Sequence, residues 1–531
     1  MRSEHWPYTV YHGTKKGHGT NMKHQKKILP AVLKTLLVLF LVWGTASLVW
    51  YLQHFGQVDI NAMLFTLHMS LEGTGSDMIG SYVQDVGFWL LTAVAVLLVL
   101  ELIRFFLARS GKLREHSIRL FRLHTTPSGI LLGVWTCVLV GAALYEFQIP
   151  AFAVNQLTAS RFVEEEYVSP NDVKLTFPEK KKNLIYILLE SGESSLQDKE
   201  HGGLFDVNYI PNMTQIANEN VSFSQGDNIQ GAAVAPACGW TMAGMVAEFS
   251  GLPLKLYEYD DTDTDNSMGN YAEFMPGAVT LGDILKDAGY KNYYMIGSDA
   301  TFGGRRNYMQ QHGDYQIMDY NYAIEQGWIP SDYFVWWGYE DQKLYQFAKE
   351  QLTQISQNAE PFNFTMLTVD THHIGGWVCP LCQNEHPEQY GNVWSCADRQ
   401  LRDILDWCKE QPFYEDTVIV IAGDHCSMDP EFYKDFSYDK HHGETTRKVY
   451  NAYLNSGLEP VSEKNRRFVT LVLFPTTLAA LGVDIEGDRL GLGTNLFSDR
   501  ETLAEEYGYE SMFKELNRRS NFYNEEILYA R

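Results

Sequence analysis

Basic residues and the signature motifs of several enzyme classes are scarce or missing in this sequence. The chain has 66 acidic and 42 basic side chains among 531 residues, a net charge of −24. This balance argues against a nucleic-acid binder, because such proteins gather Lys and Arg on one face. We expect the acidic excess to be a solvated extracytoplasmic surface. A Gly-x-Ser-x-Gly elbow, a P-loop and a His-Glu-x-x-His motif are all absent, which excludes those serine hydrolase, nucleotide-binding and zincin patterns.

Cysteine is also scarce, since the chain has only seven, an odd number that does not suit a disulfide scaffold. Cys379-Pro-Leu-Cys382 and Cys396 resemble part of a zinc site. A fourth thiol is missing, because Cys408 lies too far along the same expected helix as Cys396 to share a metal with it. Outside the cytoplasm we expect one disulfide among these three thiols, with the pair left open.

Long apolar runs, by contrast, are present in the first third of the chain. Runs at about 28–52, 86–107 and 128–149 are close to the roughly 20 residues that span a bilayer. The stretch 59–78 between the first two runs fits either an interfacial amphipathic helix or an ordinary connection. We find no cleavable signal peptide. Met22, followed by basic residues, resembles a natural start, and we assign no function to residues 1–21.

The flanking charges predict the orientation of the three runs. Basic residues precede the first run and fill the segment between the second and third, whereas the segment 53–85 has acidic residues and no Lys or Arg. The positive-inside rule therefore predicts a multi-pass protein of the cytoplasmic (inner) membrane. We expect a basic cytoplasmic tail at 1–27, a transmembrane region at 28–149, a linker at 150–180 and an extracytoplasmic catalytic domain at 181–531.

The C-terminal part alternates apolar strand patterns with helical patterns. We predict strands at 183–189, 292–296, 363–369 and 417–422, and helices such as 280–288 and 398–410. Nearly continuous apolar strands separated by helices are typical of an α/β fold, in which helices cover both faces of a mostly parallel sheet.

Charged and polar side chains follow the ends of these predicted strands. In open α/β sheets, ligands bind outside the carboxyl ends of the strands, so we expect the side chains there to meet at one edge. Four strand ends together carry carboxylates, imidazoles and a guanidinium. These candidate residues are Glu190 after the first strand, Asp299 and Arg305 after the second, His372 and His373 after the third, and Asp424 and His425 after the fourth.

Thr241 is the candidate nucleophile of this edge. It begins a small-residue helical run, where unpaired N–H groups and the helix dipole favour an alkoxide or a phosphate. Glu190, Asp424, His425 and the Thr241 oxygen form an O/N ligand set for one divalent metal, which fits Mn²⁺ best, with Zn²⁺ or Mg²⁺ as alternatives. A metal would activate the hydroxyl for covalent transfer of a phosphoryl-type group.

Four segments together resemble the sulfatase-type phosphoglycerol transferases, the family of lipoteichoic acid synthase and of the transferase that decorates periplasmic glucans. The segments are Asn183-Leu-Ile-Tyr-Ile-Leu-Leu-Glu190, Gly239-Trp-Thr-Met-Ala-Gly-Met-Val246, Asp370-Thr-His-His373 and Gly423-Asp-His425. The likeness covers about residues 180–500. Cys426-Ser427 departs from the Pro-Thr that we expect there. The Cys-x-Pro-x-Arg sequence that a true sulfatase needs is also absent.

The resemblance implies an alkaline-phosphatase-like fold and a Mn²⁺-type site. It assigns metal binding to Glu190, Thr241, Asp424 and His425, and the nucleophile to Thr241. His372 matches a histidine that contacts the phosphoglycerol group, and Arg305 resembles a phosphate-contacting arginine. The implied donor is phosphatidylglycerol, and the acceptor is an envelope glycan or a teichoic-type polymer.

Other features leave alternatives open. Trp377 is a candidate for stacking on a sugar or glycerol, and His441 and His442 for the acceptor site or an exposed loop. The acidic stretch 261–266 lacks the Gly and Glu of a calcium loop and is expected to be solvated. A phosphoethanolamine transferase, a sulfatase-like hydrolase and a catalytically inactive receptor are the rival functions. The sequence gives no oligomeric state.

Overall fold

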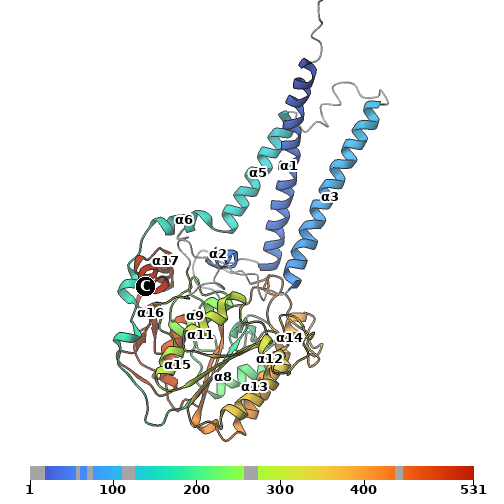
Figure 1. Cartoon of the computed structure of the whole chain (residues 1–531). Coiled ribbons are helices and arrows are strands. Elements are labelled where there is room, and N and C mark those ends of the chain that lie inside the picture. The colour runs from blue at the N-terminus through green and yellow to red at the C-terminus, as the bar shows by residue number, and fades with distance from the viewer. Residues whose placement is uncertain are drawn as a thin grey trace, which may run out of the picture. The chain divides into compact units, whose positions relative to one another are not determined.

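The computed structural model describes residues 18–55, 60–68, 76–109, 126–255, 273–436 and 447–530. It divides into two compact units (Figure 1). The first comprises Met1–Tyr51 and Asp77–Tyr145, and the second comprises Leu52–Ser76 and Glu146–Arg531. The acidic stretch 261–266 and the histidines His441 and His442 lie outside the described residues.

The first unit consists of long apolar helices: α1 (His18–Phe55), α3 (Ser76–Arg109) and α5 (Thr126–Glu146). Within them the described chain has three stretches long and apolar enough to cross a membrane, at Val32–Phe55, Ile79–Ile103 and Gly129–Glu146. The second stretch begins earlier than expected from the apolar run at 86–107, because Ile79 and Val83 extend it toward the N-terminus. Some polar side chains pair between these helices, as Trp135 does by donating to the Thr45 hydroxyl at 3.1 Å.

The second unit is built on a six-stranded sheet in the order β4-β3-β5-β2-β6-β7. All neighbouring pairs are parallel except β6 with β7. The predicted mostly parallel sheet is therefore confirmed, and the sequence patterns missed only the short β4 and β7. The strands are β2 (Asn183–Leu189), β3 (Lys291–Ile296), β4 (Gln316–Met318), β5 (Phe362–Leu367), β6 (Thr417–Gly423) and β7 (Asn451–Leu454).

Helices cover both faces of this sheet because side chains alternate along each strand. In β2, Leu184 and Leu188 join one buried core, and Ile185 and Ile187 join another. The first core also includes residues of α9 (Thr241–Ser250), α10 (Leu281–Asp287), α11 (Arg305–Gln311) and α15 (Leu473–Ala480). The second includes residues of α8 (Pro211–Glu219), α12 (Tyr320–Glu325), α13 (Asp341–Ile355) and α14 (Gln389–Lys409).

The segment expected to be a linker is folded into the second unit. Phe162 and Val163 are buried in its core, and β1 pairs antiparallel with β8. The remaining elements are α6 (Ile149–Leu157), α7 (Phe162–Glu166), β1 (Leu175–Thr176), β8 (Asp484–Ile485), β9 (Arg489–Leu490), β10 (Gly493–Thr494), α16 (Leu503–Tyr507), α17 (Tyr509–Asn517), the π-helical η6 (Tyr523–Leu528) and the 3-10 turns η1 (Pro170–Asp172), η2 (Ser194–Leu196), η3 (Phe302–Gly304), η4 (Tyr414–Asp416) and η5 (Thr470–Val472).

The connection between the first two apolar helices also belongs to the second unit. It forms the short helix α2 (Ile60–His68), whose Ala62 and Phe65 are buried in the first core while Thr66 is exposed. The ring of Phe65 lies 5.6 Å from that of Trp240, the residue before Thr241. One face of α2 is therefore buried against protein.

Candidate metal and transfer site

The carboxylate and imidazole ligands lie where β2 and β6 end. These central strands are parallel and paired up to Leu189 with Gly423, so the residues that follow leave the sheet at the same level. Glu190 follows β2, and Asp424 and His425 follow β6. All three side chains are buried. The two strands thus fix charged groups side by side although they are more than 200 residues apart in the chain.

Thr241 approaches these ligands from the first turn of α9. The helix begins at Thr241, as predicted, and its N-cap is Trp240, so the threonine hydroxyl does not cap the helix. The absence of a side chain at Gly244 permits this position, because a Cβ there would lie 2.1 Å from the Asp424 carbonyl oxygen. The helix can therefore rest directly on the backbone that carries the ligands.

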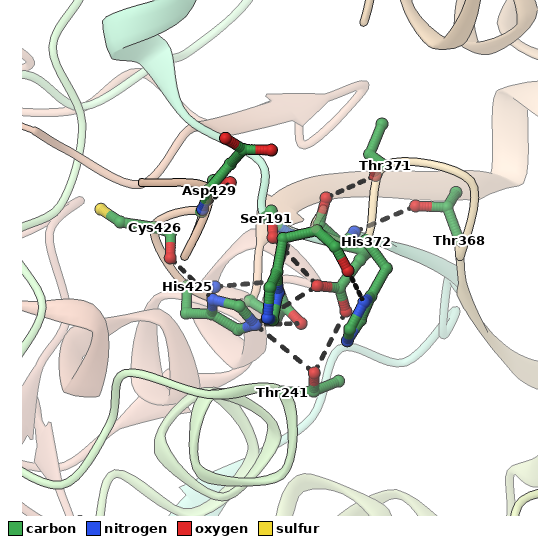
Figure 2. Close-up of polar contacts among 12 residues, drawn as sticks. Ser191, Thr241, Thr368, Thr371, His372, His425, Cys426 and Asp429 are labelled. Carbon is green, nitrogen blue, oxygen red and sulfur yellow. Dashed lines mark hydrogen bonds and ion pairs between the residues drawn. The ribbon is translucent and has the colours of Figure 1, made fainter. Parts of the chain in front are cut away.

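The hydroxyl of Thr241 contacts two of the predicted ligands (Figure 2). Its Oγ1 lies 3.1 Å from Glu190 Oε2 and 3.4 Å from His425 Nε2. His425 Nε2 in turn lies 3.4 Å from Glu190 Oε1 and 3.5 Å from Asp424 Oδ2. The structure thus brings together all four residues that the sequence selected as ligands.

These residues fit a single divalent ion. Glu190, Asp424 and His425 each offer a ligand atom, and these atoms lie within 4.8 Å of one another. Asp424 Oδ1 accepts from the Ser191 and His425 N–H groups, whereas Oδ2 has no hydrogen-bond partner among the described residues. His425 Nδ1 lies 2.8 Å from the Cys426 carbonyl oxygen, which fixes the proton on Nδ1 and leaves the Nε2 lone pair for a metal.

The electrostatics of the group also favour a cation. Burial, reinforced by the charge of Glu190, raises the pKa of Asp424 to about 8. Burial tends to lower the pKa of His425, but Asp424 and Glu190 outweigh it and raise that pKa to about 10. Burial would raise the pKa of Glu190, yet the neighbouring His425 holds it below its usual value. A divalent ion would supply the positive charge that protons otherwise provide here.

A buried ion pair supports the loop that carries His425. Glu193 accepts a hydrogen bond from the Ser427 N–H at 2.6 Å and from Arg447 Nε at 2.9 Å. Arg447 also donates to the Ser427 carbonyl oxygen at 2.7 Å and lies over the Tyr433 ring. This pair fixes the chain just beyond the ligands. The sequence pattern included Glu193 at a strand end but gave no sign of its distant partner.

His372 and His373 lie on the loop that follows β5. Figure 2 shows the His372 ring next to the Thr241 hydroxyl. Its Nδ1 lies 2.7 Å from the His373 carbonyl oxygen, so Nε2 is left as an acceptor. Burial lowers the pKa of His372 despite the nearby charge of Glu190, which favours the neutral ring. The His373 ring stacks on it at 4.6 Å and contacts Phe55 at 5.6 Å.

Arg305 begins α11 close enough to His372 for its charge to disfavour protonation of that ring. It is buried, and none of the ion pairs among the described residues includes it. Its Nη2 is 3.4 Å from the Asp299 carbonyl oxygen. The Asp299 carboxylate is occupied by the Thr301 N–H and the Asn321 amide, both at 2.8 Å. Arg305 therefore suits an anionic ligand, whereas Asp299 shapes the loop before it.

Aromatic rings complete this side of the site. The Trp337 ring lies 4.9 Å from that of His372, and Trp336 stacks on Trp377 at 6.3 Å. Trp377 is half-buried, as a platform for a substrate ring or glycerol requires. Sequence analysis had singled out Trp377 but missed Trp336 and Trp337, because their segment is far from every predicted strand end.

An acidic pair lies behind the histidine loop. Asp341 accepts hydrogen bonds from the N–H groups of Val369 and Asp370, at 2.8 and 3.0 Å. Neither carboxylate oxygen of the buried Asp370 has a hydrogen-bond partner among the described residues. Burial, with smaller contributions from nearby Cys379 and Glu190, raises the pKa of Asp341 to about 7. Burial and Asp341 raise that of Asp370 well above its usual value.

The three clustered thiols meet beside α14. Cys379 Sγ lies 3.7 Å from both Cys396 Sγ and Cys382 Sγ, and no S–S bond joins them. Cys396 and Cys408 do lie on the same helix, as expected. The expected disulfide stays a prediction, but Cys379 is the thiol that can reach either partner.

Comparison with known proteins agrees with the motifs of the site. The sulfatase family profile matches residues 182–483. Phosphoglycerol transferase I of Xanthomonas campestris pv. campestris is 32% identical over 406 residues, covering 75% of this chain and 52% of that protein. Phosphoglycerol transferase I of Salmonella heidelberg is 28% identical over 391 residues, covering 70% and 46%. The chain spans about half the length of the curated relatives it matches.

Among solved structures, lipoteichoic acid synthase LtaP from Listeria monocytogenes is 18% identical, with a TM-score of 0.48 over 64% of this chain and 82% of that one. The periplasmic domain of EptC from Escherichia coli is 11% identical, with a TM-score of 0.40 over 60% and 88%. The family match covers more than half of the chain and contains the predicted metal ligands and the Thr241 helix. The chain therefore belongs to the sulfatase family.

Proposed function

We propose that this chain is a membrane-anchored, metal-dependent phosphotransferase that moves phosphoglycerol from phosphatidylglycerol to an envelope acceptor. The observation that carries the proposal is the Thr241 hydroxyl, 3.1 Å from Glu190 and 3.4 Å from His425 at the start of α9. The name of the curated relatives, phosphoglycerol transferase I, supports this donor. The acceptor is a hydroxyl of a glycan or of a polyglycerol phosphate.

In the first step the Thr241 oxygen attacks the donor phosphorus. The new bond joins Thr241 Oγ1 to phosphorus, and the bond from phosphorus to diacylglycerol breaks. Glu190, Asp424 and His425 would hold a divalent ion, Mn²⁺ in preference to Zn²⁺ or Mg²⁺, which would supply a Lewis acid to lower the pKa of the Thr241 hydroxyl. His372 Nε2 takes the Thr241 proton and returns it to the departing diacylglycerol oxygen.

In the second step the acceptor hydroxyl attacks the same phosphorus and Thr241 is released. His372 takes the acceptor proton and gives it to the Thr241 oxygen, so the enzyme returns to its starting state. Arg305 faces the phosphoryl oxygens, and its burial without a carboxylate partner suits this role. His373 and Trp377 contact the glycerol group, and Asp299 holds the Arg305 loop in place.

The three apolar helices anchor the enzyme beside its lipid donor. We propose the arrangement that the flanking charges predict, with the basic N-terminal tail in the cytoplasm and the catalytic unit on the outer side of the cytoplasmic membrane. The anchor raises the effective concentration of a donor confined to the same bilayer.

Intact mass spectrometry tests the proposal directly. The full-length protein is incubated with phosphatidylglycerol and Mn²⁺ without an acceptor, and Thr241→Ala serves as the control. We expect a phosphoglycerol adduct that peptide mapping places on Thr241 and that the variant lacks. An adduct formed only from phosphatidylethanolamine would show that this lipid, and not phosphatidylglycerol, is the donor. Hydrolysis of phosphate esters without any adduct would show that the enzyme is a hydrolase and not a transferase.

A further inference from the structure

Two loops, one of which carries His372 and His373, have no Asp, Glu, Lys or Arg between the acidic residues Asp332, Glu340, Asp370 and Glu385 that flank them. They are the segments 333–339, Tyr-Phe-Val-Trp-Trp-Gly-Tyr, and 371–384, Thr-His-His-Ile-Gly-Gly-Trp-Val-Cys-Pro-Leu-Cys-Gln-Asn. Ring contacts hold them side by side, because Trp336 stacks on Trp377 and Trp337 lies on His372. The exposed side chains of these two joined segments therefore form one surface.

This surface, which we call the apolar rim, also exposes large apolar side chains. Phe334 is 48% exposed, Ile374 41%, Val378 49% and Leu381 46%. The other exposed large apolar side chains among the described residues from 146 onward are Ile149, Val154 and Leu157 of α6, and Val207, Leu458, Val461 and Tyr507. Exposed apolar side chains that cluster next to an active site indicate a contact surface for an apolar partner.

The end of the first apolar helix identifies that partner. The stretch Val32–Phe55 is apolar enough to span a bilayer, and Phe55 is its last residue. The Phe55 ring lies 5.6 Å from the ring of His373, which precedes Ile374 of the rim. Phe55 and His373 belong to the same compact unit. Phe55, the last residue of that apolar stretch, therefore contacts the loop that exposes the apolar side chains.

We propose that the apolar rim enters the outer surface of the bilayer and forms the entrance through which the donor lipid reaches Thr241. This inference rests on the proposed function and adds the route of the substrate to it. The donor head group then moves sideways from the membrane surface to the site, and its acyl chains stay in the hydrocarbon.

The test compares two donors that carry the same head group. The full-length protein is placed in nanodiscs, and phosphatidylglycerol is supplied either as a long-chain lipid of the same disc or as a short-chain analogue dissolved as monomers. The variant Phe334→Asp/Val378→Asp puts one charge on each loop of the rim. We expect its rate with the bilayer donor to fall about tenfold or more, because charges resist entry into the membrane, and its rate with the dissolved donor to stay within about twofold of wild type.

The control variant is Leu458→Asp/Val461→Asp. Leu458 and Val461 are 37% and 69% exposed and follow β7, whose end pairs with Ile419 near the start of β6, at the edge of the sheet away from the ligands. We expect this variant to match wild type with both donors. If the rim variant loses activity with both donors equally, or with neither, the inference is overturned while the proposed function stands. A wild-type protein that consumes neither donor overturns both.

Discussion

The two sides of the site are built from different kinds of structure. The ligand side, with Glu190, Asp424 and His425, lies on the ends of β2 and β6, whose pairing is fixed by the buried sheet. The histidine side, with His372 and Arg305, lies on loops held by hydrogen bonds and ring contacts. The difference teaches that the proposed metal ligands are fixed by the sheet, while the proposed substrate contacts are carried by loops that can change without disturbing the sheet.

The largest expected effect is a loss of bound metal, which we expect from a substitution on the ligand side but not from one on the histidine side. Asp424→Asn removes a ligand, so we expect the bound metal to be lost and turnover to fall by about 10³-fold or more. The matched variant on the other side, His372→Gln, is expected to lose turnover but keep the metal. Metal analysis of the purified proteins and a turnover assay check both. A full complement of metal in Asp424→Asn would contradict the ligand assignment.

The support of the ligand side is the next most sensitive feature. Glu193→Gln leaves the Arg447 charge buried without its carboxylate, and breaking such a pair typically costs about 3–5 kcal/mol. We expect a clear fall in the thermal midpoint of the purified protein. Replacing both partners, as in Glu193→Met/Arg447→Met, is expected to restore part of the loss. A single variant as stable as wild type would show that the pair does not hold the loop.

The aromatic rings of the histidine side are expected to matter less. Trp337→Ala removes the ring that packs on His372, and we expect kcat/KM to fall about tenfold with unchanged metal content, since one aromatic contact contributes about 0.5–1.5 kcal/mol. Trp407→Ala is the control, because that ring packs on Phe413 instead. Steady-state kinetics distinguish the two. Metal loss in Trp337→Ala would contradict the independence of the two sides.

The acidic pair behind the histidine loop, Asp341 and Asp370, is expected to make the stability of the fold depend on pH. Asp341 has a pKa of about 7 in the folded protein against 3.8 as its ordinary value, and that of Asp370 is raised further. The folded state therefore holds protons that the unfolded chain releases, so this contribution to stability is present below about pH 4 and lost as the pH rises through about 7. We expect Asp370→Asn to flatten this dependence of stability on pH. Thermal unfolding between about pH 5 and pH 8 measures it. An unchanged slope would exclude the pair as its source.

The smallest effect concerns the thiols. We expect oxidised protein to contain one disulfide that includes Cys379, because Cys379 is the thiol within 3.7 Å of both Cys382 and Cys396. Non-reducing peptide mapping identifies the pair. Cys379→Ser should leave both Cys382 and Cys396 as free thiols and lower stability modestly without removing activity. A disulfide between Cys382 and Cys396 would contradict the expectation.

The sequence selected the residues that the structure brings together on the ligand side, because the signals of these residues are local. A buried strand followed by an acid, as at Glu190 and Asp424, indicates both the strand and the edge where its end residues gather. It could not predict Arg447 or Trp337, because their contacts depend on how distant loops fold back. The acidic pair of Asp341 and Asp370 was missed for the same reason. The role of α2 in the second unit was also hidden, since an apolar stretch between two membrane spans has several possible partners.

Gly244 has a consequence for how this enzyme can vary. With hydrogen alone at that position, the backbone of α9 sits against the Asp424 carbonyl, so the distance from nucleophile to ligands is set by two main chains in direct contact. Side-chain substitutions elsewhere can retune substrate choice without altering that spacing. Even a single methyl group at position 244 would push α9 away from the Asp424 backbone and move Thr241 away from the ligand side chains. A very small increase in side-chain volume at this glycine would therefore lower the reaction rate.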